Sequence, residues 1–170
     1  MTLTTHAIVG ASVAQFFPGY PVVAFLAAIA SHYLSDRIPH YNLGDHLNSL
    51  KRNETGSRKS LEGFTYGRSF IRDGSIVGGD LILGVLLAFL FWTGASPWLV
   101  GVGCLGGLLP DLLQIAYGFW NKNKILLTLR RFHDRMHAPR ETDIKDVSVA
   151  ILIESSFVAV VLLLSKLFLA

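Results

Sequence analysis

The chain has 170 residues, of which 51% are hydrophobic and 16% are charged, and its formal net charge is +3. Soluble domains carry about 25% charged residues, so this composition excludes an ordinary water-soluble protein. We expect one membrane domain over residues 1–170, with the lipid bilayer as its main partner. The positive charge is too small to predict a nucleic-acid partner, and the composition leaves the oligomeric state open.

Five apolar segments follow one another along the chain. They comprise residues 6–17, 21–36, 75–93, 97–120 and 147–169. The last three have the ~20 residues that an α-helix needs to cross a bilayer. The first two are shorter, so they must tilt, thin the bilayer locally or pack as a hairpin. The pattern predicts an all-α integral membrane bundle of about five apolar helices.

Two polar stretches, residues 42–73 and 121–146, separate these segments and are predicted to be loops on one side of the membrane. In the second stretch, apolar residues recur at the spacing of one helical face: Ile125, Leu129, Phe132 and Met136. This spacing predicts an additional amphipathic helix, which we expect to lie in the membrane interface.

The basic residues are distributed asymmetrically. If all five segments cross the membrane, 14 of the 15 basic residues fall on one side and only Lys166 falls on the other. The positive-inside rule makes the basic side cytoplasmic. We therefore expect a protein of the cytoplasmic (inner) membrane, with the N-terminus on the cytoplasmic side.

Ionisable side chains gather at this same side. His32, Asp36 and His40 follow one another at steps of four residues, close to one face of a helix. His133 and His137 form a second pair with the spacing of a metal clip. An ionisable group at the centre of a membrane helix costs roughly 2.5–3.5 kcal/mol, so such residues are expected to have a function.

Imidazole and carboxylate groups are ligands for zinc and similar divalent metals. The candidate ligands are His6, His32, Asp36, His40, Asp80, Asp111, His133 and His137. Eight ligands are too many for one tetrahedral site and suit two ions that share a bridging carboxylate. Zinc is the expected metal, with manganese or another transition metal as the alternative. For the two isolated acids, Asp80 and Asp111, a hydrogen bond to a neighbouring helix is the alternative interpretation.

Further residues are candidates for the chemistry itself. The candidate catalytic residues are Asp36, Asp111 and Glu154. Glu154 fits a ligand, a general base or a contact between helices equally well. The planar guanidinium groups of Arg37, Arg131 and Arg135 are suited to bind phosphate. A basic interface beside a two-metal site favours an anionic lipid headgroup as substrate.

Four short motifs resemble those of a known family. They read THAIVG at residues 5–10, SHYLSD at 31–36 followed by Pro39 and His40, LPD at 109–111 and FHDRMH at 132–137. Together they resemble the membrane-bound metal-dependent hydrolases, including the group described as LexA-binding inner-membrane proteins, with a distant kinship to zinc-dependent phospholipase C. The resemblance spans most of the chain and implies a hydrolase. It also implies a metal centre at His6, His32, Asp36, His40, Asp111, His133 and His137.

The sequence thus predicts a membrane-embedded, metal-dependent hydrolase of the phosphodiesterase or phosphatase type, acting on a phosphoester in a lipid or another amphiphile. A metal or ion transporter is one alternative, and a non-catalytic scaffold with a structural metal is another. A transporter needs polar residues across the whole membrane, and the far half of the segments has few. An open coordination position would favour an enzyme over a scaffold.

Overall fold

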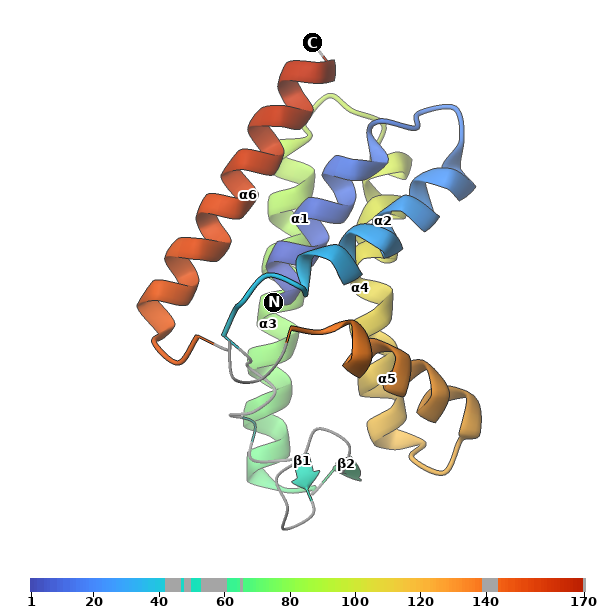
Figure 1. Ribbon diagram of the computed structural model, residues 1–170, viewed down its shortest axis with the longest axis vertical. Coiled ribbons are helices and arrows are strands. Elements are labelled where there is room, and N and C mark those ends of the chain that lie inside the picture. Colours follow the sequence, from blue (N-terminus) through green and yellow to red (C-terminus); the bar gives the residue numbers. More distant parts are fainter. Residues whose placement is uncertain (42–46, 48–49, 53–60, 65, 139–143, 170) are drawn as a thin grey trace.

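The computed structural model describes residues 1–41, 47, 50–52, 61–64, 66–138 and 144–169. Over these residues it contains six helices and one short antiparallel pair of strands (Figure 1). The elements are α1 (Leu3–Ala14), α2 (Pro21–Ser35), β1 (Leu50–Arg52), β2 (Leu61–Phe64), α3 (Arg68–Phe91), α4 (Pro97–Phe119), α5 (Lys124–Met136) and α6 (Val147–Leu169).

The helical architecture predicted from the sequence is confirmed, but the polar stretch over residues 42–73 differs from the prediction. It contains β1 and β2, and its last six residues already belong to α3, which begins at Arg68. The prediction started this helix at residue 75, where the hydropathy rises. It was wrong because an exposed, polar turn of helix can extend beyond the apolar part without any change in hydropathy.

Three helices, α3, α4 and α6, are long and apolar enough to cross a membrane. The other two apolar helices are shorter, with 12 residues in α1 and 15 in α2. At 1.5 Å per residue they reach only about 18 and 22 Å, whereas the hydrocarbon core of a bilayer is about 30 Å thick. The expectation that about five helices cross the membrane is therefore not confirmed.

Helix α1 lies at the centre of the bundle and contacts α2, α3, α4 and α6. Ten of its 12 residues are buried. Its closest approach is to α4, where a Cβ atom on Gly10 would collide with the backbone of Gly103 and Gly107. Small residues allow two helix backbones to come this close in a membrane protein.

The outer faces of α3 and α6 are exposed and apolar. Leu86 and Leu90 of α3 and Leu163 and Leu167 of α6 are each more than 60% exposed. Contiguous apolar surface of this extent is unusual for a soluble monomer. Together with the lengths of the three long helices, it supports an association with the membrane.

The polar parts of the chain gather at one end of the bundle. In Figure 1, β1, β2 and the turn from α4 to α5 lie at the bottom, whereas the turns after α1 and α3 and the end of α6 lie at the top. Helix α5, the amphipathic helix predicted from the sequence, runs from the bottom back toward the N-terminus. The two basic stretches therefore share one end of the molecule.

Candidate metal centre

Five histidines surround the buried carboxylate of Asp36. Their Nε2 atoms lie 3.1 Å (His6), 3.2 Å (His32), 3.3 Å (His137), 3.4 Å (His133) and 4.0 Å (His40) from an oxygen of Asp36. Asp111 of α4 adds a second carboxylate, 3.8–3.9 Å from the Nε2 atoms of His6, His32 and His133. The structure thus brings together seven of the eight candidate ligands.

Two helix ends meet at the centre and carry most of these side chains. Helix α2 ends at Ser35, so Asp36 is its C-cap, and His40 follows in the next turn. Helix α5 ends at Met136, and its C-cap, His137, has extended backbone angles. The amide of Ala138 donates a 2.9 Å hydrogen bond to the carbonyl of Asp36, which joins the two helix ends.

Two of the imidazoles are oriented by backbone carbonyl groups. The Nδ1–H of His32 donates to the carbonyl of Gly107 at 2.7 Å, and that of His40 donates to the carbonyl of Ile38 at 2.7 Å. A carbonyl only accepts hydrogen bonds, so Nδ1 carries the proton and Nε2 of the neutral ring offers its lone pair to the centre. This is the usual arrangement of metal-binding histidines.

The charge states of Asp36 and His40 are those that a metal requires. Burial alone raises the pKa of Asp36, but the charge of the neighbouring His6 and the hydrogen bond between His6 and Oδ1 lower this pKa far below its usual range. Burial lowers the pKa of His40. The centre therefore presents a carboxylate and a neutral imidazole, which are the forms that bind metal ions.

The arrangement also leaves buried polar atoms unsatisfied. Within the described part of the chain, His32 Nε2 and Asp36 Oδ2 make no hydrogen bond, although both residues are only 1% exposed. A buried polar atom without a partner destabilises a protein by about 1–3 kcal/mol. Coordination of a metal ion would satisfy both atoms, so the residues present fit a bound cation.

Three overlapping groups of ligand atoms could each hold an ion. They are His6, His32 and Asp36; His32, Asp111 and His133; and Asp36, His133 and His137. Within each group the ligand atoms lie within 4.8 Å of one another. Because the groups share members, they form one continuous site rather than three separate ones.

The structure does not place Asp80 and Glu154 in any of these groups; both carboxylates bind the first turn of α1. Asp80 accepts hydrogen bonds from the amides of Leu3 and Thr4 and from the Thr4 hydroxyl. Glu154 accepts from the amide and hydroxyl of Thr2 and from the hydroxyl of Thr5. These acids satisfy the unpaired amides at a helix start and complement its dipole.

We therefore expect Asp80→Asn and Glu154→Gln to destabilise the protein while leaving the metal centre intact. Asp80 binds the start of α1 through both carboxylate oxygens, so Asp80→Asn loses one acceptor, which should lower the free energy of unfolding by about 1–3 kcal/mol. Glu154 binds through Oε2 alone, so Glu154→Gln keeps an acceptor and loses only the negative charge, and we expect a smaller destabilisation. Thermal unfolding in detergent and metal analysis of the same samples check this. Loss of bound metal at an unchanged melting temperature would instead identify either carboxylate as a ligand.

The three candidate phosphate-binding arginines, Arg37, Arg131 and Arg135, are all exposed. Sequence reasoning missed Arg130, which is only 7% exposed and lies on α5 one turn before His133. Its guanidinium lies 5.1 Å from the ring centroid of Tyr117 on α4. The spacing of three residues to His133 could have identified it, because it places both residues on one helical face.

Sequence reasoning also assigned no role to the amino group of Met1. This group donates a 2.9 Å hydrogen bond to Oδ1 of Asp36. It therefore lies among the imidazoles at the centre.

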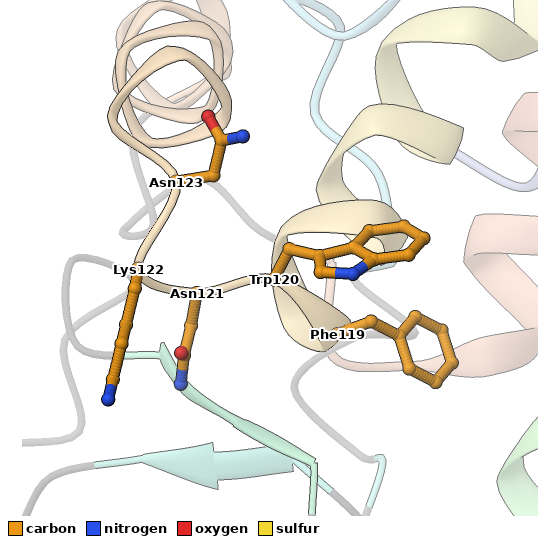
Figure 2. A pocket seen from close by; sticks show the side chains of 5 residues that line it. All are labelled: Phe119, Trp120, Asn121, Lys122 and Asn123. Carbon is orange, nitrogen blue, oxygen red and sulfur yellow. The ribbon is translucent and has the colours of Figure 1, made fainter.

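An open pocket of about 290 Å³ lies elsewhere, at the turn between α4 and α5. Figure 2 shows that the rings of Phe119 and Trp120 lie on one side of it, with Asn121 and Lys122 on the other. Its lining includes none of the candidate ligands. The pocket is therefore separate from the metal centre.

No protein-family model, curated protein or solved structure matches the chain. The function is therefore inferred from the geometry of the centre.

Proposed function

We propose that this protein is a membrane-embedded, metal-dependent hydrolase that cleaves a phosphoester in a lipid or another amphiphilic substrate. The observation that carries the proposal is the ring of five imidazole Nε2 atoms around the buried carboxylate of Asp36. A ring of this kind is the donor set of a divalent transition metal, and zinc is the metal that it suits best. The motif resemblance described above points to the same class of enzyme.

The two oxygens of Asp36 face different histidines, which supports a centre for two ions. Oδ1 lies near His6 and His40, whereas Oδ2 lies near His32, His133 and His137. Asp111 is divided in the same way: its Oδ2 faces His6, and its Oδ1 faces His32 and His133. Both carboxylates would therefore be available to hold two ions, one on each side.

The two carboxylates differ in their access to solvent. The side chain of Asp36 is 1% exposed and that of Asp111 is 23% exposed. Two bound ions about 3.5–4 Å apart would supply an activated water and stabilise both reacting oxygens of a phosphoester. The accessible side of the centre is the side of Asp111, where we place the water and the substrate, and this access favours an enzyme over a structural metal site.

The far half of α1 offers little support for a transporter. The Ser12 hydroxyl donates to the carbonyl of Ile8 and accepts from the Trp92 indole, and the Gln15 side chain donates to the carbonyl of Ala11. These polar groups satisfy one another or the helix backbone. They give an ion no continuous series of ligands toward the far end of the bundle.

Metal analysis joined to an activity panel tests the proposal. Protein purified without chelator should contain one to two transition-metal ions per chain and should hydrolyse a phosphodiester or phosphomonoester, including lipid examples. A chelator should abolish the activity, and zinc or manganese should restore it. Absence of metal, even after these ions are added, would overturn the proposal. Retained metal without activity on any phosphoester would identify a structural metal instead.

A further inference from the structure

Two helices independently give the depth of the metal centre in the membrane. We take Arg72, an exposed charge near the start of α3, and Asp146, which precedes α6, as the boundary of the hydrocarbon core on the basic side. Asp80 and Glu154 each lie eight residues further along the chain. Both intervals correspond to about 12 Å along a helix. Because both carboxylates bind the first turn of α1, two separate helices place that turn at the same depth.

The opposite boundary agrees with this depth. Trp92 lies 20 residues after Arg72, Lys166 lies 20 residues after Asp146, and the Lys166 ammonium is 5.7 Å from the Trp92 ring centroid. Twenty residues span about 30 Å, the thickness of the hydrocarbon core. A centre about 12 Å from one boundary leaves about 18 Å of the hydrocarbon core on its other side, which equals the length of α1. The short length of α1 is thereby explained.

Helix α5 runs from the basic end of the bundle toward the N-terminus (Figure 1), and His133 and its C-cap His137 lie beside Asp36 in the metal centre. Its two exposed stripes differ in character. Lys124, Thr128, Arg131 and Arg135 form a polar stripe, and Ile125, Leu129 and Phe132 form an apolar one. Arginine side chains are not stable against hydrocarbon, so we expect the polar stripe to face water along its whole length, including at Arg135, which lies two residues before His137 of the metal centre.

We propose that the polar stripe of α5 borders a water-filled entrance that guides the anionic phosphate headgroup of a bilayer lipid to the metal centre. The apolar stripe contacts the acyl chains of the same lipid. The positive charges of Lys124, Arg131 and Arg135 lead along α5 toward His137, one of the metal ligands. The lipid as substrate rests on the proposed function, whereas the entrance rests only on the fold.

Thiol labelling in vesicles tests the entrance, because Cys104 is the only cysteine of the chain and is buried. In a Cys104→Ala background, Arg135→Cys reports on the polar stripe. Leu152→Cys is the matched control, since Leu152 is 67% exposed on α6 and lies six residues from Asp146. With the vesicles made permeable to a charged thiosulfonate reagent, we expect Arg135→Cys to react at least tenfold faster than Leu152→Cys. An uncharged maleimide should label both.

Equally slow reaction of both variants with the charged reagent, in protein that retains its metal, would overturn the entrance. Labelling in the presence of phosphatidic acid then tests the lipid. Protection of Arg135→Cys by phosphatidic acid, but not by glycerol phosphate or phosphatidylcholine, supports a lipid phosphate. Equal protection by glycerol phosphate, or none by phosphatidic acid, would overturn this assignment. Labelling requires no turnover, so the outcome is independent of the hydrolysis test.

Discussion

Replacing Asp36 with Asn should abolish hydrolysis and remove bound metal while the protein still inserts into membranes. The substitution keeps the shape of the side chain but removes the charge that faces five imidazoles. Replacing a residue that only orients a metal ligand typically lowers metal affinity or activity by about 10–100-fold. Loss of the shared carboxylate should exceed this, with turnover lower by roughly 10³-fold, equivalent to about 4 kcal/mol.

Turnover and metal content per chain, measured on the same preparations, check this prediction. Asp146→Asn is the matched control, because Asp146 lies outside the centre and caps the start of α6, where it accepts from the amides of Ser148 and Val149. That variant should keep its metal and its activity. Full activity in both Asp36→Asn and Asp111→Asn would show that the reaction takes place somewhere else.

Gly107→Ala should unfold the bundle or prevent it from holding metal. The new Cβ atom would overlap the carbonyl of His6, so α1 and α4 would have to separate. The same residue accepts the hydrogen bond that orients His32. Overpacking of a tight core typically costs about 1–3 kcal/mol, and here the displaced backbone carries a ligand, so stability and metal binding should fall together.

Gly101→Ala is the control for this substitution, since a Cβ atom there meets nothing within 4 Å. It should leave metal binding unchanged and raise stability by roughly 0.5–1 kcal/mol through the better helix propensity of alanine. The melting temperatures of both variants in detergent, together with metal analysis, show whether the two substitutions differ in their effects on stability and metal binding. Similar melting temperatures would mean that α1 and α4 do not pack at this distance.

Much of the helical arrangement could be predicted from hydropathy, and the rest could not for identifiable reasons. The bounds of α6 agree with the prediction, because polar residues precede a long apolar run. Hydropathy did not settle how many helices cross the membrane, because apolar side chains that pack against protein look the same in sequence as those that face lipid. The ten buried residues of α1 pack against protein.

Spacing within a helix was similarly informative about the candidate centre, and contacts between distant segments were not. The steps of four residues from His32 to Asp36 and His40 anticipated the positions that the structure brings together. By contrast, a carboxylate in an apolar helix fits a metal ligand and a helix cap equally well. Glu154 could be recognised as a cap only from its contact with Thr2, 152 residues away along the chain.

The hydrogen bonds that join the first turn of α1 to α3 and α6 have a consequence for biosynthesis. Helix α1 leaves the ribosome first, yet the acceptors for its opening amides and hydroxyls arrive with Asp80 and, last of all, with Glu154. His6 follows this turn directly and contacts Asp36, so we expect its final position to depend on these late contacts. We therefore expect the candidate metal centre to be completed only after the final helix has entered the membrane.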